Sequence, residues 1–235
     1  MTGTLHGIGV GPGDPELMTL RAARLIGACP VIAYPAPDSG ESFARAIASP
    51  VIPDGALEVP MVVPMRVERF PAQDVYEAAA ATLAGHLDEG RDVAVLCEGD
   101  PFFYGSFMYL FARLAERYPV EITPGVSSLG ACAAAARHPL TARADTLAVL
   151  PGTLPDEALR PRIEAAEAVA IMKVGRHLPR LRALLGGMGL GERTTYVERA
   201  SLPDQSVRPL AEAPPVAPYF SMLLTYKGED PWLSR

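Results

Sequence analysis

Short apolar runs alternate with helix-like segments along the chain, and this alternation limits the possible folds more than any other feature. In the first half, three such pairs lie at residues 5–10 and 17–26, 31–34 and 42–48, and 92–97 and 103–117. Strands joined through helices pair in parallel, because each helix carries the chain back to the starting end of the sheet. The sequence therefore predicts an α/β fold with a largely parallel sheet.

A second set of strand-like runs begins near residue 120 and predicts a second domain. The turn at residues 123–125 leads into an alanine-rich stretch, residues 126–136, that is typical of a closely packed helix. Further strand candidates are residues 147–150, 168–173, 194–198 and 219–226. We therefore expect two α/β domains, residues 1–120 and 121–235.

Two other kinds of segment are interpreted as scaffold or loop. Residues 72–87 carry an apolar stripe at helical spacing, which predicts a helix packed on a sheet. Three proline-rich segments, residues 30–37, 50–64 and 203–218, are interpreted as irregular loops because apolar residues interrupt them throughout.

Charge and composition exclude several classes of function. The net charge is −6 and no run of Lys or Arg occurs, which argues against a nucleic-acid surface. No apolar stretch approaches the ~20 residues of a membrane span, and the start lacks a signal-peptide pattern, so we expect a cytoplasmic protein. The three cysteines, Cys29, Cys97 and Cys132, have apolar surroundings and predict buried thiols, with no disulfide and no metal site.

Two glycine-and-acid loops are the strongest indication of a binding site. Residues 9–16 and 98–105 each follow an apolar run and precede a helix-like stretch. Glycine allows tight turns, and an aspartate in such a loop binds a ligand or its own backbone. The first loop lacks the Gly-Lys-Ser/Thr end of a phosphate loop, and Asp14 stands where the dinucleotide fingerprint has glycine. Ordinary strand-to-helix connections remain the alternative.

Four stretches resemble, in sequence and in order, the tetrapyrrole methylase family. They are Gly9-Val10-Gly11-Pro12-Gly13-Asp14, Glu98-Gly99-Asp100-Pro101, Pro124-Gly125-Val126-Ser127-Ser128 and Tyr196-Val197-Glu198-Arg199-Ala200. The resemblance covers nearly the whole chain. It implies two α/β domains with S-adenosylmethionine folded in the cleft between them, unlike the ordinary Rossmann methyltransferase.

Within the family, residues 98–110 and 196–205 resemble the precorrin-2 C20-methyltransferase branch of cobalamin biosynthesis. Glu98 is informative here, because most other branches have glycine or serine in its place. This resemblance implies a tetrapyrrole as substrate, S-adenosylmethionine as methyl donor, no metal required by the chain, and a homodimer.

The resemblance also implies a set of donor-binding residues. Carried over by position, they are Pro12, Gly99, Asp100, Phe103, Ser127, Ser128, Met172 and Ala200. Each residue type has a physical reason: glycine permits close backbone approach, and hydroxyls with helix N–H groups suit a carboxylate. For Met172, which would pack on adenine, the alternative is an ordinary core methionine.

Candidates for catalysis and for substrate binding follow from the reaction implied. The methylated carbon must lose a proton, and Glu98, Tyr104, Tyr109 and Glu198 are candidate bases, Glu98 and Tyr104 being preferred because they flank the second loop. Glu98 as a turn cap, Tyr109 as a core residue and Glu198 paired with Arg199 are the alternatives. For the substrate's carboxylates we expect Arg66, Arg69, Arg137, Arg143 and Arg176, together with His138 and His177. Arg66 and Arg69 lie in residues 61–70, which we expect at the rim of the macrocycle.

Three readings of function stay open on the sequence. The first is C20 methylation of precorrin-2, or of its cobalt-loaded form in the anaerobic pathway. The second is methylation of another corrin position or of a more distant target, such as rRNA ribose or the diphthamide precursor, although the acidic chain argues against RNA. The third is a non-catalytic module that binds S-adenosylmethionine.

Overall fold

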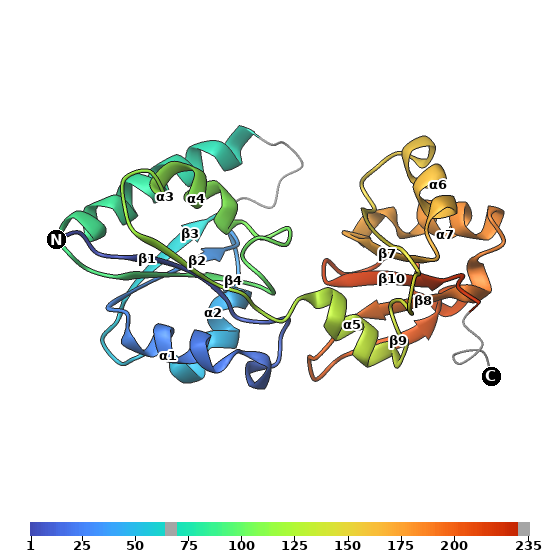
Figure 1. Ribbon diagram of the computed structural model, residues 1–235, viewed down its shortest axis with the longest axis horizontal. Coiled ribbons are helices and arrows are strands. Elements are labelled where there is room, and N and C mark those ends of the chain that lie inside the picture. Colours follow the sequence, from blue (N-terminus) through green and yellow to red (C-terminus); the bar gives the residue numbers. More distant parts are fainter. Residues whose placement is uncertain (64–69, 230–235) are drawn as a thin grey trace. The chain divides into compact units, whose positions relative to one another are not determined.

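The computed structural model describes residues 1–63 and 70–229 (Figure 1). The chain forms two compact units, Met1–Ser127 and Ser128–Arg235. The sequence placed the boundary between residues 120 and 121, inside a strand that pairs within the first sheet, whereas in the structure residues 121–127 belong to the first unit.

A five-stranded parallel sheet forms the centre of the first unit. Its strand order is β3-β2-β4-β1-β5 and every pairing is parallel. The strands are β1 (Leu5–Gly9), β2 (Val31–Ala36), β3 (Leu57–Val62), β4 (Val93–Cys97) and β5 (Val120–Thr123). The prediction of a parallel sheet is confirmed for this unit.

Helices cover both faces of this sheet, α1 and α2 on one face and α3 and α4 on the other (Figure 1). They are α1 (Leu20–Ala28), α2 (Phe43–Ala48), α3 (Phe70–Asp88) and α4 (Phe107–Leu114), with 3-10 turns η1 (Pro15–Leu17) and η2 (Ser49–Val51). Along β4, Val93 and Val95 pack under α3 and α4, whereas Ala94 and Leu96 pack under α1 and α2. Burial on both faces explains why β4 is a continuous apolar run, and every residue of β1 is buried as well.

The sheet of the second unit is mixed. Its order is β6-β7-β10-β8-β9, with β6 and β7 parallel and every other pairing antiparallel. The strands are β6 (Leu147–Pro151), β7 (Ala168–Met172), β8 (Thr194–Glu198), β9 (Ser206–Pro209) and β10 (Ser221–Tyr226). The sheet is not all parallel because the connections from β8 to β10 hold no helix long enough for a crossover. The prediction of a parallel sheet rested on the first half of the chain alone.

One face of the second sheet is covered by α6 and α7 and the other by α5 (Figure 1). The helices are α5 (Ser128–Ala136), α6 (Asp156–Ala165) and α7 (Leu178–Gly187), with 3-10 turns η3 (Gly175–His177), η4 (Gly191–Arg193) and η5 (Leu210–Glu212). In β10, Leu223 packs toward α6 and α7, and Met222 and Leu224 pack toward α5.

The interpretation of the proline-rich segments as loops is wrong in part. Residues 31–36, 57–62 and 206–209 within them are strands β2, β3 and β9. Strands β3 and β9 lie at sheet edges, where Pro60 and Pro209 are tolerated because an edge strand leaves one row of N–H groups unpaired. Among the described residues, none of the helices has the length and apolar character needed to cross a membrane.

Candidate active site

Three loops converge at the carboxyl end of the first sheet. They follow the neighbouring strands β4, β1 and β5, and their glycines Gly99, Gly9 and Gly125 lie in close contact. A Cβ atom on Gly125 would lie 2.0 Å from the Gly99 carbonyl oxygen, and one on Gly9 would lie 2.6 Å from the Gly125 nitrogen. Any side chain at Gly9 or Gly125 would therefore force the loops apart.

The first and second loops are joined by a short backbone bridge. The Gly99 N–H donates to the Gly11 carbonyl at 2.7 Å, and the Gly11 N–H donates to the Gly99 carbonyl at 3.3 Å. Gly11 has a φ of +88° and Gly99 a φ of +65°, angles that glycine adopts without strain. This bridge accounts for two of the glycines noted in the sequence.

Asp100 fixes the second loop and ties it to the third. One carboxylate oxygen accepts the backbone N–H groups of Phe102 and Phe103, at 2.9 and 3.1 Å. The other accepts the N–H of Gly125 at 3.1 Å. Asp100 therefore holds the loops in position through contacts with backbone N–H groups, one of the two roles that the sequence suggested for an aspartate in such a loop.

The loop residues offer polar groups that suit a small, charged ligand. Pro12 is half-buried, and Ser127 lies two residues after Gly125 at the end of the first unit. At the end of β5, the Thr123 hydroxyl is buried and has no hydrogen-bond partner among the described residues. An unpaired buried hydroxyl costs free energy, so this edge suits a polar group or a water molecule. The residues present fit a donor of the S-adenosylmethionine type.

Glu98 lies between β4 and this loop cluster, and burial raises the pKa of its carboxyl. Hydrogen bonds from the backbone N–H groups of Glu98 and Ala44 act in the opposite direction. The nearby Cys97 thiol has its pKa raised to about 12, chiefly by burial, and stays neutral at ordinary pH. Glu98 is thus a carboxyl group in a desolvated environment, a setting that tunes acids toward general-base work near neutral pH.

Tyrosine and phenylalanine side chains gather around the second loop. Tyr104 and Tyr109 are 44% and 46% exposed, and Tyr104 has a φ of +58°, a strained angle for this residue type. The Phe103 ring lies 5.3 Å from that of Tyr104. Tyr109 is exposed, which contradicts its alternative interpretation as a core residue.

A buried tyrosine that the sequence did not indicate packs against Tyr109. Tyr76 of α3 packs against Tyr109, with ring centroids 4.9 Å apart, and burial raises the pKa of the Tyr76 phenol, although Ser106 acts in the opposite direction. The segment 72–87 was interpreted as scaffold because its apolar positions account for the helix, and nothing in that spacing marks Tyr76.

In the second unit, the structure brings Met172 and Ala200 together. Both belong to the apolar cluster between the sheet and α5, with Ala131 and Cys132 of that helix. Met172 ends β7 and Ala200 follows β8, so both lie at the carboxyl ends of these two strands. Ser128 is the first residue of α5.

Glu198 and Arg199 each have a partner, and they do not pair with each other as the sequence suggested. The Tyr196 hydroxyl donates to a Glu198 carboxylate oxygen at 2.5 Å, and Arg199 pairs with Asp204. Glu198 therefore has a direct structural role in β8.

The arginines expected to bind substrate lie at opposite ends of the strands in the second sheet. Arg176 lies in η3, just beyond the end of β7 and near Met172. Arg137 is next to His138, whose ring lies 5.8 Å from that of Tyr226, and Tyr226 pairs with Ala168 at the start of β7. Arg137 therefore lies near the start of β7, at the opposite end of this strand from Met172.

Arg143 also lies near the start of β7. Two residues further on, Asp145 accepts a hydrogen bond from the Tyr226 hydroxyl at 2.7 Å. His138 and Tyr226 also line a pocket of about 410 Å³ at this end of the strand, together with Glu192, Arg193, Thr195, Gly228 and Glu229. The expected grouping of Arg137, Arg143 and Arg176 is wrong, since sequence order does not show at which end of a sheet a loop lies.

Two further expectations about cations have different outcomes. The pKa of His177 is lowered by burial and by Arg180 and Arg176, so this ring is neutral near pH 7 and does not supply a charge. Arg66 and Arg69 lie outside the described residues.

Arg180, which sequence reasoning missed, lies near the same end of β7 as Met172. Its guanidinium donates to the Gly152 carbonyl at 2.5 Å and pairs with Asp156, which fixes the loop after β6. Its place in α7 gave no signal, because an arginine on a helix is usually exposed. Across the described residues, no group of three or more His, Cys, Asp or Glu side chains could hold a metal ion.

Comparisons with known proteins agree with this geometry. The model of the Tetrapyrrole (Corrin/Porphyrin) Methylases matches residues 4–214. A Sinorhizobium protein named precorrin-2 C(20)-methyltransferase is 42% identical over 97% of each chain. A Salmonella typhimurium protein named cobalt-precorrin-2 C(20)-methyltransferase is 31% identical over 97% of this chain and 98% of its own.

A solved structure has the same fold. It is uroporphyrin-III C-methyl transferase from Thermus thermophilus complexed with S-adenosyl homocysteine, with a TM-score of 0.68, 25% identity, and coverage of 95% of this chain and 97% of that one. From the order of the loops, the two α/β units and the family match, we conclude that this chain belongs to the tetrapyrrole methylase family.

Proposed function

We propose that this chain transfers a methyl group from S-adenosylmethionine to C20 of precorrin-2 in cobalamin biosynthesis, giving precorrin-3A. The observation that carries the proposal is the 42% identity, over 97% of both chains, to a protein named for this reaction. The Glu98-Gly99-Asp100-Pro101 loop supports it, since its glutamate is typical of this branch.

Bound S-adenosylmethionine would supply an electrophilic methyl group. We propose that Pro12, Gly99, Phe103 and Ser127 of the first unit contribute to its binding, with Asp100 holding their loops. From the second unit we propose Ser128, Met172 and Ala200. The complex of a relative with S-adenosyl homocysteine supports a donor of this type. The rigid glycine contacts support it too, because a site that is formed in advance loses little entropy on binding.

Among the candidate bases, we propose Glu98 as the group that accepts the proton from C20. Its buried carboxyl has a raised pKa, which brings its basicity closer to that of a base working near neutral pH. Glu198 is less suited because Tyr196 already occupies one of its oxygens. Tyr104 and Tyr109, exposed beside the second loop, are proposed to contact the substrate's flat face.

For the carboxylates of the substrate we propose Arg176, which lies near the same end of β7 as Met172. Arginine suits this role because its planar fork binds a carboxylate through two parallel hydrogen bonds. We also propose a cytoplasmic homodimer, on the family resemblance. Light scattering at several protein concentrations tests the dimer.

The test is an anaerobic turnover assay with labelled S-adenosylmethionine and enzymatically made precorrin-2. We expect the product to gain one methyl group by mass spectrometry. Glu98→Gln should bind donor normally and turn over at least about tenfold more slowly. Donor binding without methyl transfer to any tetrapyrrole would support the binding-module alternative instead.

A second candidate is the cobalt-loaded substrate of the anaerobic pathway. The 31% identity to the Salmonella protein named for it favours this candidate, although less than the 42% match favours the metal-free one. Comparing kcat/KM for precorrin-2 with and without cobalt decides between the two.

A further inference from the structure

Phe102 of the second loop is an exposed aromatic residue whose ring is held in place by two rings of α4. The side chain is 45% exposed. Its ring centroid lies 5.3 Å from that of Phe111, at an interplanar angle of 81°, and 6.0 Å from that of Phe107. Both separations are those of favourable aromatic contacts, and the Phe111 contact is edge-to-face. Phe102 is thus an apolar ring that faces solvent from a fixed position.

The two rings that hold Phe102 belong to the core of the first unit. Phe107 is fully buried, and Phe111 packs against the same cluster between the sheet and helices α3 and α4. A Cβ atom on Gly7 of β1 would lie 2.4 Å from the Phe107 ring, so this ring packs directly on the strand. Ring contacts therefore join the exposed Phe102 to the centre of the sheet, and its position does not depend on a mobile surface side chain.

The backbone of Phe102 is fixed by the carboxylate that orders the candidate site. One oxygen of Asp100 accepts the Phe102 N–H at 2.9 Å and the Phe103 N–H at 3.1 Å. The other oxygen accepts the N–H of Gly125, in the loop after β5, at 3.1 Å. Since Phe103 is a proposed donor-binding residue, Phe102 adjoins the proposed donor site and is held by the same hydrogen bonds.

We propose that the exposed ring of Phe102 binds the flat macrocycle of the substrate, and that Phe107 and Phe111 are positioning residues that hold this ring. The inference rests on the proposed function, in which the substrate is a tetrapyrrole. An aromatic ring suits such a ligand because two π systems attract each other beyond the apolar area that they bury. A ring that is fixed before binding also loses little conformational entropy when the ligand packs on it.

A second copy of this chain is the other possible occupant of the Phe102 surface, and two observations favour the substrate. The first is the continuity with the donor loops through Asp100, which an interface between copies does not require. The second is area: a phenylalanine side chain buries about 150–250 Å², so the exposed part of Phe102 is about 100 Å², against about 800 Å² on each partner of a standard protein interface. A single ring of this size fits a small flat ligand better.

The test measures binding of uroporphyrin III, a flat tetrapyrrole that is stable in air, by the shift of its main absorption band. Phe102→Leu keeps an apolar side chain and removes the ring, so we expect the Kd to rise about fivefold. Phe102→Tyr keeps the ring and should bind within about twofold of the wild-type protein. Both variants should bind S-adenosyl homocysteine as the wild type does, because the Asp100 hydrogen bonds to the backbone remain.

Phe111→Leu tests the positioning role. It leaves Phe102 in the chain but removes the ring against which Phe102 packs edge to face. We expect a Kd for uroporphyrin III that is about twofold to threefold higher than in the wild-type protein, a smaller loss than in Phe102→Leu.

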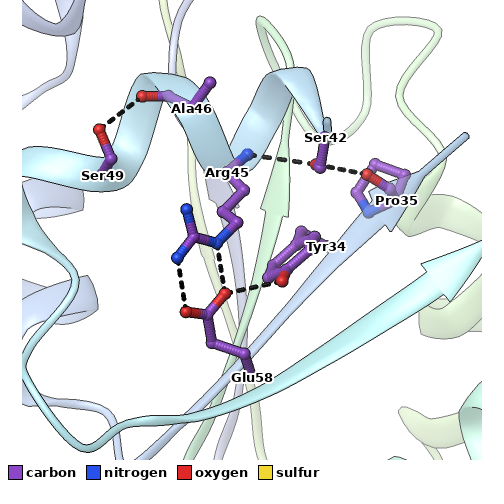
Figure 2. A network of polar contacts seen from close by, with 7 residues as sticks. All are labelled: Tyr34, Pro35, Ser42, Arg45, Ala46, Ser49 and Glu58. Carbon is purple, nitrogen blue, oxygen red and sulfur yellow. Dashed lines mark hydrogen bonds and ion pairs between the residues drawn. The ribbon is translucent and has the colours of Figure 1, made fainter. Parts of the chain in front are cut away.

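The control for a general loss of stability is Tyr34→Phe, on the opposite face of the same sheet. The Tyr34 hydroxyl donates to the Glu58 carboxylate at 2.7 Å, and Arg45 donates to the two oxygens of that carboxylate at 2.5 and 2.7 Å (Figure 2). The variant removes one hydrogen bond from this network and therefore destabilises the first unit. It should leave the affinity for uroporphyrin III unchanged.

In turnover, Phe102→Leu should raise the KM for precorrin-2 about fivefold and change kcat by less than about twofold, because the ring binds the substrate and the transition state alike. Equal affinity for uroporphyrin III in the wild type and Phe102→Leu would overturn the inference, as would no binding by the wild type. Unchanged binding together with a lower mass by light scattering would assign the ring to an interface between copies instead. Weaker binding by Phe102→Leu, with no methyl transfer to C20 by the wild type, would support the surface and contradict the proposed reaction.

Discussion

Two helices of the second unit, α5 and α7, end in the same turn but form it with different residues. Gly189, two residues after α7, has a φ of +70°, and Arg137, directly after α5, has the same left-handed conformation with a φ of +52°. Both ends have the same hydrogen bonds: the next residue's N–H, of Leu190 or His138, reaches back to the carbonyl of Leu185 or Ala133. The same cap is thus formed with glycine and with arginine.

The contrast extends to the loops at the candidate site. In the first unit, the described left-handed residues are glycines with the exception of Tyr104. In the second unit, most are other residues: Arg137, Arg143, Lys173, Arg199 and Ser201. Lys173 and Arg199 follow β7 and β8 directly, where Met172 and Ala200 lie. Apart from Tyr104, the first unit therefore has unstrained, closely packed loops, whereas the second unit has more strained residues beside its site residues.

The glycine contacts of the first unit should give the largest effect. Gly125→Ala places a Cβ 2.0 Å from a backbone oxygen that has no room to move, so we expect the free energy of unfolding to fall by about 3 kcal/mol, measured by urea denaturation. Gly85→Ala in α3 is the control, because its Cβ meets nothing within 4 Å, and it should stabilise by about 1 kcal/mol. Similar stability of the two variants would contradict the close packing.

We expect the second largest loss of stability at Asp100. Asn at this position keeps one acceptor oxygen and turns an NH₂ group toward a backbone N–H, so Asp100→Asn should lose about 2 kcal/mol of stability by urea denaturation. Asp14→Asn is the matched change in the first loop, where the carboxylate accepts the Glu16 N–H at 2.9 Å and asparagine caps equally well. An equal loss in both variants would show that Asp100 is not the link between the loops.

Two variants test the comparison between arginine and glycine at the ends of α5 and α7. Arg137→Gly should raise the free energy of unfolding by about 1 kcal/mol, since glycine adopts the left-handed angle without strain. Gly189→Ala should lower it by about the same amount, although its Cβ meets no atom within 4 Å. Thermal unfolding of both variants measures the two shifts, and shifts of the same sign would contradict the account of the caps.

The smallest effects concern pH. Arg45 lowers the pKa of Glu58 to about 2, and Thr146 lowers that of Glu167 in the second unit to about 2, both from 4.5. A lowered folded pKa stabilises the protein above pH 4.5, and this stability is lost as the pH falls toward 2. Glu58→Gln and Glu167→Gln should each flatten the fall in unfolding free energy over this range.

Glu98 should behave in the opposite sense. Its raised folded pKa means that the folded state binds the proton more tightly, so stability falls as the pH rises from 4.5 through the folded pKa. Glu98→Gln should remove this fall in urea denaturation curves taken from pH 4 to pH 8. An unchanged pH dependence would show that Glu98 is not desolvated.

The sequence predicts the fold best where burial and glycine determine it. Strands β1 and β4 are buried on both faces, and their loops carry glycines that mark the turns. Strands β3 and β9 were missed because they are exposed edge strands containing Pro60 and Pro209. The mixed sheet was missed because the apolar pattern of a strand does not show its direction.

The candidate site was predictable only in part. The loop residues around Gly99 and Asp100 could be found from their spacing, but the contact from Asp100 to Gly125 of another loop could not, because it joins residues distant in sequence. Arg137 and Arg176 were grouped because both follow apolar segments, and only the strand pairing separates them by the length of β7.

The most direct test of the central claim is the position of the transferred methyl group. The protein is incubated anaerobically with precorrin-2 and S-adenosylmethionine labelled with ¹³C at the methyl carbon, and the product is analysed by ¹³C NMR. Our account predicts a single labelled methyl at C20. A labelled methyl at any other carbon, or no transfer to either the metal-free or the cobalt-loaded substrate by donor-competent protein, would contradict it.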